Sequence, residues 1–241
     1  MDLLLQAQDF SLQYDNSAMD WDIEGGAATP QRRYFSRHID ARPEEVYEKK
    51  VLDVGSGLGW FLQEALDKGA ARVVGVEPSA LAERTDVDGA EIVRATFGEF
   101  RSEEKFDFIT FILSTEHMHP IQEILLKAKD LLAPNGTICI LTGDINAFSR
   151  QRFNNIVVAQ ELTPDQESVV RTERPTGFGT TIDIVRSMSY WNRVAQDVQL
   201  KITEHKPVVA EQDYIDQFPR YEEFRSAPFL HVLRMKRGEN E

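Results

Sequence analysis

The run of residues best suited to chemistry is VLDVGSGLG, at positions 51–59. It places Asp53 two residues before Gly55, and two further glycines follow at alternate positions, Gly57 and Gly59. Glycine adopts backbone angles that other residues disfavour, and it lacks the Cβ atom that would keep a ligand away from the main chain. A glycine-rich turn after an apolar run therefore predicts a site where a ligand lies directly against the backbone, beside the carboxylate of Asp53.

A second carboxylate, Glu77, ends the next apolar run, ARVVGVE, roughly 20 residues beyond the glycine turn. An acid in that place can accept hydrogen bonds from both hydroxyls of a ribose. The dinucleotide fingerprint G-x-G-x-x-G would have its third glycine where this chain has Trp60. The carboxylate of Asp53 would also repel a pyrophosphate and attract an amino group. The pattern favours an adenosine ligand with an amino group, and a nicotinamide oxidoreductase is the weaker alternative.

Histidines and an acid gather in STEHMHP, directly after another apolar run. His117 is the candidate general base, because histidine ordinarily titrates near neutrality and can take a proton from a hydroxyl or an amine. The alternative for His117 is packing or capping at the start of the following helix. A metal site built from Glu116, His117, His119 and Asp144 fits no ligand spacing typical of metal motifs, so no metal is expected.

Strand and helix patterns alternate from position 50 onward and explain how these residues reach one edge of a sheet. The expected strands are 50–55, 71–77, 90–96, 106–114 and 137–144, and the expected helices are 60–70, 79–85 and 119–136, the last ending in a PNG turn. Such alternation predicts a parallel sheet with right-handed crossovers. Ligands bind at the carboxyl ends of the strands in sheets of this kind.

The alternation stops beyond Asp144. Residues 145–180 are polar and predict a segment that covers an acceptor, residues 182–196 predict a helix, and residues 200–209 and 228–236 predict the last two strands. Because no adequate crossover helix separates these two strands, we expect them to pair antiparallel. The predicted fold is α/β: a Rossmann-like, seven-stranded, mostly parallel sheet with an antiparallel last strand, helices on both faces and an N-terminal helical extension.

Arginines and aromatic residues in the covering segments have two interpretations. A carboxylate or phosphate could be held by Arg150, Arg152, Arg171 and Arg174, or these side chains could belong to a solvated loop. A flat acceptor could be walled by Tyr14, Trp21, Tyr34, Phe178 and Trp191, or these rings could belong to the core.

The overall charge is acidic: 241 residues carry 27 basic and 40 acidic side chains, for a formal net charge of −13. Such a surface repels phosphate backbones, so nucleic acid is not an expected partner. No apolar run approaches the ~20 residues that a membrane helix needs, and the first residues lack the basic region of a signal peptide. These observations predict a cytoplasmic protein with no membrane partner. Cys139 lies in an apolar run and is expected to be a core residue.

The glycine turn VLDVGSGLG, with VVGVEPS behind it, resembles the first motif of class I S-adenosylmethionine-dependent methyltransferases. The EH after the fourth expected strand, the proline that follows and LLAPNG before the fifth strand look most like the ubiquinone-biosynthesis O-methyltransferase type and related small-molecule methyltransferases. The resemblance covers residues 49–145 in detail and 182–236 in outline.

The resemblance implies a role for each matching residue. Asp53 would face the amino group of the methionine part, and the glycine turn at Gly55 and Gly57 would lie under that part and the ribose. Glu77 would bind the ribose hydroxyls. Phe97 would lie at the adenine, with its backbone N–H toward a ring nitrogen, while Ser114 would flank the methionine part.

The implied reaction is transfer of the methyl group of S-adenosylmethionine to an oxygen or nitrogen of a small-molecule acceptor, with S-adenosylhomocysteine as the product. The expected organisation is a helical cap or lid over 1–36 and a methyltransferase domain over 37–241, with a substrate-covering insertion at 145–180. The cap could pack on a second subunit in a homodimer. Two alternatives stay open: a protein or tRNA methyltransferase, which the acidic surface disfavours, and an inactive S-adenosylmethionine-binding regulatory protein.

Overall fold

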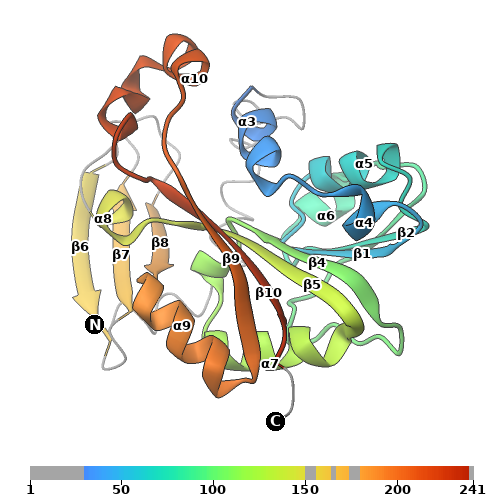
Figure 1. Ribbon diagram of the computed structural model, residues 1–241. Coiled ribbons are helices and arrows are strands. Elements are labelled where there is room, and N and C mark those ends of the chain that lie inside the picture. The colour runs from blue at the N-terminus through green and yellow to red at the C-terminus, as the bar shows by residue number, and fades with distance from the viewer. Residues whose placement is uncertain (1–29, 150–155, 164–166, 174–179, 239–241) are drawn as a thin grey trace.

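A seven-stranded sheet forms the centre of the computed structural model, which describes residues 30–149, 156–163, 167–173 and 180–238 (Figure 1). The strands are β1 (Lys50–Val54), β2 (Arg72–Val76), β3 (Ala90–Val93), β4 (Phe106–Ile112), β5 (Leu132–Gly143), β9 (Leu200–Val208) and β10 (Leu230–Arg237). Their order in the sheet is β3-β2-β1-β4-β5-β10-β9. The first five strands are parallel, and β10 is antiparallel to both of its neighbours. The predicted fold class is confirmed.

The strand order reverses between β1 and β4, and this reversal decides where a ligand can enter. Connections from these two strands leave in opposite directions, and in open α/β sheets ligands bind outside the carboxyl ends of the strands at such a reversal. Because β10 is antiparallel to both β5 and β9, strand β9 runs in the same direction as β5. The connection from β9 to β10, residues 209–229, therefore lies at the carboxyl edge of the parallel strands.

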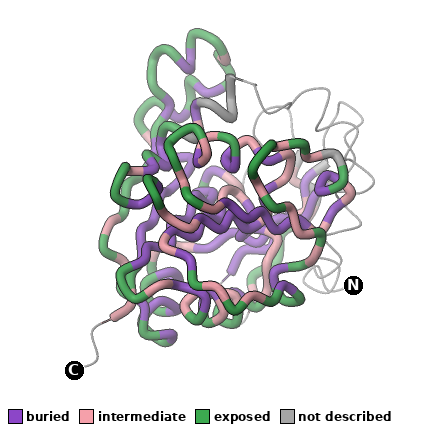
Figure 2. The backbone as a smooth tube through the Cα atoms, turned by 90° about the vertical axis from the view of Figure 1, so that its right-hand side faces the viewer, coloured by how far each residue is buried: buried purple, intermediate pink, exposed green. Residues whose placement is uncertain are grey.

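Helices cover both faces of the sheet. The structure has α3 (Pro30–Ile39), α4 (Pro43–Val46), α5 (Trp60–Asp67), α6 (Leu81–Arg84), α7 (Ile121–Leu131), α8 (Ile145–Phe148), α9 (Met188–Asp197) and α10 (Gln212–Gln217), with 3-10 turns η1 (Thr115–His117) and η2 (Pro219–Phe224). Figure 2 shows buried backbone running through the middle of the molecule with exposed segments around it.

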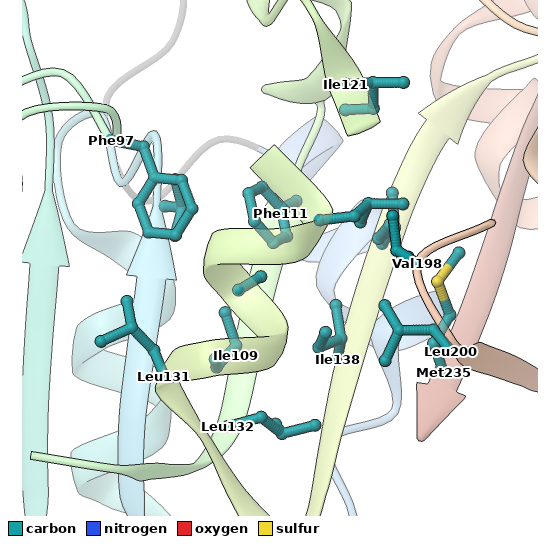
Figure 3. Close-up of a cluster of buried hydrophobic side chains, with 14 of the residues drawn as sticks. Phe97, Ile109, Phe111, Ile121, Leu131, Leu132, Ile138, Val198, Leu200 and Met235 are labelled. Carbon is teal, nitrogen blue, oxygen red and sulfur yellow. The ribbon is translucent and has the colours of Figure 1, made fainter. Parts of the chain in front are cut away.

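Apolar side chains alternate between the two faces of the buried strands. In β1, Leu52 and Val54 join the cluster that packs under α7 and α9, whereas Val51 joins the cluster under α3 and α5. Figure 3 shows part of the first cluster, in which Ile109, Phe111 and Ile138 lie beside residues from α7. Parallel strands that are covered on both faces need apolar residues at nearly every position, which explains the continuous apolar runs in the sequence.

The insertion after β5 contains a second sheet that the sequence reading missed. Strands β6 (Ile156–Leu162), β7 (Ser168–Glu173) and β8 (Thr180–Val185) form an antiparallel three-stranded sheet. The predicted helix over 182–196 was therefore wrong at its start, because Ile182 and Ile184 alternate toward a small apolar cluster with Val169. Helix α9 begins only after Ser187, whose hydroxyl accepts the backbone N–H of Tyr190 at 3.2 Å.

The described part of the N-terminal extension, α3, is anchored to the β9–β10 connection. Tyr34 stacks on Tyr214 with ring centroids 3.8 Å apart, and its hydroxyl donates to the carbonyl of Val209 at 2.8 Å. Tyr34 and Trp191 are core residues here. Arg171 lies on β7. The remaining aromatic and basic candidates lie outside the described residues: Tyr14, Trp21, Phe178, Arg150, Arg152 and Arg174. No helix among the described residues is long and apolar enough to cross a membrane.

Candidate active site

The glycine turn follows β1 and has the backbone shape that the sequence predicts. Gly55, Gly57 and Gly59 have positive φ angles of 75°, 53° and 77°, a region that favours glycine. A Cβ atom on Gly55 would lie 2.5 Å from the Cβ of Ser114, which no side chain tolerates. A Cβ on Gly57 would meet nothing within 4 Å. Gly55 is therefore required by packing against β4, and the backbone at Gly57 is open to a ligand.

Glu77 lies beside this turn with its carboxylate held in a fixed orientation. One oxygen accepts the backbone N–H of Gly57 at 2.9 Å, and the other accepts the N–H and the hydroxyl of Ser79 at 3.0 and 2.6 Å. The residue is 7% exposed. A carboxylate has about four acceptor positions, so these three bonds leave capacity for a further donor. The sequence reading missed Ser79 as the orienting partner.

Asp53 is the most strongly perturbed acid of the site. It is 2% exposed and accepts a hydrogen bond from the hydroxyl of Thr110 at 2.7 Å. Burial raises the pKa of Asp53 to about 7; the hydrogen bond from Thr110 opposes the shift, and the charge of Glu77 adds to it. A cation beside Asp53 would favour the ionised carboxylate, so this residue is suited to recognising an amino group.

Ser114 and Phe97 direct their side chains at other residues of the protein. The hydroxyl of Ser114 donates to the carbonyl of Val54 at 2.7 Å and so ties the end of β4 to the end of β1. The ring of Phe97 is buried and meets Phe111 edge to face, with centroids 5.6 Å apart (Figure 3). The roles of Ser114 beside a methionine moiety and of the Phe97 backbone at an adenine stay predictions.

His117 lies in η1, directly beyond β4, at the same edge of the sheet as the glycine turn. Its Nδ1 is 3.9 Å from a carboxylate oxygen of Asp183, which lies on β8 of the small sheet formed by β6, β7 and β8. The side chain of His117 is 16% exposed. Sequence reasoning missed Asp183. The period-two alternation of IDIV, residues 182–185, was the available signal for a strand that would carry Asp183 away from the apolar face.

The other polar residues near His117 serve the scaffold. Glu116 is 2% exposed and accepts hydrogen bonds from the N–H of Gly143 at 2.6 Å and the hydroxyl of Thr142 at 2.8 Å. Asp144 caps α8 and accepts a further bond from His231 at 2.9 Å. These carboxylates are directed at protein donors. Within the described ranges, no three histidine, cysteine or acidic side chains form a group that could hold a metal ion.

The site therefore combines an open backbone turn, two buried acids and a histidine at the ends of adjacent parallel strands. A sequence profile described as a methyltransferase domain matches residues 27–205. The chain belongs to this methyltransferase family. This match confirms the family resemblance that the sequence motifs indicate. The similar proteins also confirm the fold and S-adenosylmethionine as the cofactor of the class.

Curated proteins similar to this chain include ubiquinone biosynthesis O-methyltransferases. The chain is 36% identical over 112 residues to the ubiquinone biosynthesis O-methyltransferase of Pasteurella multocida (strain Pm70), a match that covers 39% of this chain and 46% of the relative. It is 29% identical over 118 residues to the enzyme of the same name from Haemophilus ducreyi (strain 35000HP / ATCC 700724), covering 44% of this chain and 50% of the relative. The chain thus spans about half the length of the curated relatives it matches.

Solved structures support the fold over most of the chain. An S-adenosylmethionine-dependent methyltransferase from Mesorhizobium loti superimposes with a TM-score of 0.65 at 17% identity, covering 87% of this chain and 99% of the other. The CcbJ methyltransferase from Streptomyces caelestis gives a TM-score of 0.63 at 18% identity, covering 96% of this chain and 100% of the other. At such identities the likeness concerns the fold alone.

Proposed function

We propose that this protein transfers the methyl group of S-adenosylmethionine to a hydroxyl oxygen of a small-molecule acceptor. The observation that carries the proposal is the pairing of Gly57, whose backbone is open to a ligand, with the oriented carboxylate of Glu77 at 2.9 Å. The similarity to ubiquinone biosynthesis O-methyltransferases supports an oxygen acceptor.

The residues at the carboxyl edge match the chemistry of the methyl donor. Glu77 can accept a hydrogen bond from a ribose hydroxyl because one of its about four acceptor positions remains. Asp53 is ionised more readily when an ammonium group lies near, which suits it to the methionine part. A Cβ on Gly57 would occupy the open side of the turn, so glycine keeps the backbone accessible to the donor.

His117 is the proposed general base. When bound, S-adenosylmethionine supplies a methyl carbon on a positively charged sulfur, which leaves with the electron pair of the broken carbon–sulfur bond. His117 accepts the proton of the acceptor hydroxyl as its oxygen forms the new bond to that carbon. Holding the hydroxyl in line with the methyl group supplies the larger part of the acceleration over the uncatalysed reaction.

The surroundings of this edge favour a small acceptor. The β9–β10 connection lies at the ends of the parallel strands, and α3 is joined to it by the hydrogen bond from Tyr34 to Val209. The small sheet reaches the same edge through Asp183, which lies beside His117. The net charge of −13 repels nucleic acid. We therefore place the acceptor over the ends of β4 and β5, next to η1.

The experiment that tests the proposal is calorimetric titration of the parent and of Glu77→Ala with S-adenosylmethionine and S-adenosylhomocysteine. A hydrogen bond to a charged acceptor contributes about 1.5–3 kcal/mol, so loss of the one that Glu77 still has capacity to accept should weaken binding by about 10- to 100-fold. Glu103→Ala, which removes an exposed acid, should bind like the parent. A folded parent that binds neither compound would contradict the proposal.

Methyl transfer itself is tested by incubating the protein with S-adenosylmethionine and either catechol or aniline, followed by mass spectrometry. We expect a mass increase of one methylene group on catechol and none on aniline. Methylation of aniline alone would move the acceptor class to nitrogen. Tight donor binding with no transfer to any hydroxyl or amine in a metabolite extract would favour the regulatory protein.

Asp53 leads to a pH prediction for the same titration. Because the pKa of Asp53 is raised to about 7, the carboxyl group is mostly protonated below that pH and must lose its proton to meet an ammonium. The affinity for S-adenosylhomocysteine should therefore rise by about 25-fold between pH 5.5 and 7.5. Asp53→Asn should bind more weakly at pH 7.5 and lose this dependence, whereas Asp88→Asn, at an exposed position, should retain it.

A further inference from the structure

The turn that carries His117 is held by an arginine from the small sheet. Arg186 directly follows β8 and is 1% exposed. One of its terminal nitrogens donates to the carbonyl of Thr115 at 2.7 Å, and the other donates to the carbonyl of Met118 at 2.7 Å. These carbonyls lie on either side of His117, so the planar guanidinium fixes the backbone of the turn from both ends.

A buried acid in turn fixes Arg186. Glu167, which precedes β7, has no exposed surface, and its carboxylate accepts a hydrogen bond from Nε of Arg186 at 2.7 Å. Its other oxygen lies 3.4 Å from Nδ1 of His119. A buried guanidinium and a buried carboxylate are tolerated only when each has its partner, so this pair requires the small sheet and the turn to stay together.

The same sheet presents a carboxylate to the imidazole. Asp183 lies on β8, is 9% exposed, and has a carboxylate oxygen 3.9 Å from Nδ1 of His117. This distance is longer than a hydrogen bond, but contacts of this kind in ligand-free sites commonly tighten once substrate is bound. A carboxylate facing Nδ1 favours the proton on that nitrogen and leaves the lone pair on Nε2.

Among the described residues, four ionisable groups near His117 have partners of their own. Glu116, on the same turn, accepts bonds from Gly143 and Thr142, and Arg186, Glu167 and His119 form the cluster described above. Asp183 faces the ring from the small sheet, with a carboxylate oxygen 3.9 Å from Nδ1 of His117.

We propose that Asp183 is a positioning residue that selects the Nδ1–H tautomer of His117, while Arg186 holds the turn in place. The three-stranded sheet then forms part of the active site, in addition to the covering role that the sequence predicts for the insertion. The inference rests on the proposed function, because it assigns Nε2 of His117 as the atom that accepts the proton.

The test is nitrogen-15 spectroscopy of the histidine rings with S-adenosylhomocysteine bound, at alkaline pH, where histidine side chains are ordinarily neutral. The shifts of the two ring nitrogens report which of them carries the proton. The parent should show His117 mainly with the proton on Nδ1. Asp183→Ala should move the tautomer ratio toward Nε2–H by about tenfold, and Asp183→Asn, which keeps an oxygen acceptor, by less.

Glu161→Gln removes one exposed acid from the same sheet and should leave the ratio at its parent value. A parent ratio that favours Nε2–H, or the same ratio in the parent and both Asp183 variants, would overturn the inference. Titration of the same samples with S-adenosylmethionine separates the two proposals. Failure of the parent to bind contradicts the proposed function, and the ring signals of the ligand-free protein still show whether Asp183 selects the tautomer of His117. If Asp183→Ala does not fold, Asp183→Asn provides the comparison, because asparagine preserves the side-chain volume.

Discussion

Replacing Arg186 with methionine should lower the free energy of unfolding by about 3–5 kcal/mol, because it removes the guanidinium that neutralises the fully buried carboxylate of Glu167. The substitution also removes the hydrogen bonds to the carbonyls of Thr115 and Met118. Urea unfolding followed by circular dichroism measures the change. Methionine is long and apolar enough to fill much of the same space, so the loss reports on charge and hydrogen bonding rather than on a cavity.

Two further variants control this measurement. Arg225→Met breaks an ion pair with Glu222 in which both partners are exposed, so it should change stability little. Adding Glu167→Gln to Arg186→Met should recover part of the loss, because a neutral amide costs less to bury than an unpaired carboxylate. Equal effects of Arg186→Met and Arg225→Met would contradict the buried pair as the link between the small sheet and the turn.

Replacing His117 with glutamine should lower kcat for methyl transfer to a hydroxyl acceptor by about 100- to 10,000-fold, the range of a positioned general base. Glutamine keeps polar atoms near the same place but cannot accept a proton near neutral pH. Affinity for the methyl donor, measured by calorimetry, should stay at the parent value because the donor contacts proposed here come from the ends of β1 and β2. Initial rates at saturating acceptor provide the comparison.

The pH profile distinguishes loss of a base from a general disturbance of the site. A pH dependence that the proton-accepting role of His117 imposes on kcat should disappear in the variant. His205→Gln, at an exposed position on β9, should retain the parent rate and profile. An unchanged kcat in His117→Gln would mean that alignment alone drives the reaction and that the base assignment is wrong.

The part of the candidate site that we propose for the methyl donor could be located from the sequence because it is built from short contiguous patterns. The glycine turn, Asp53 and Glu77 all lie at the ends of apolar runs whose length and composition identify them as buried parallel strands. Once two such strands are recognised, their carboxyl ends must meet at one edge. The antiparallel pairing of β9 and β10 followed from the absence of a crossover helix, which is also a local observation.

Apart from Ser79, which lies close to Glu77 in the sequence, the partners of these residues were decided by tertiary structure. Thr110 donates to Asp53 because β1 and β4 pair in a register that places the two residues side by side. Arg186 meets the carbonyl of Thr115 across 71 residues of sequence, and nothing in the local pattern of either segment indicates the other. Residues 182–185 form a strand rather than a helix because β7 is available to pair with them. Hydrogen-bond partners on separate elements depend on how those elements pack, so only the folded chain determines which acid faces His117.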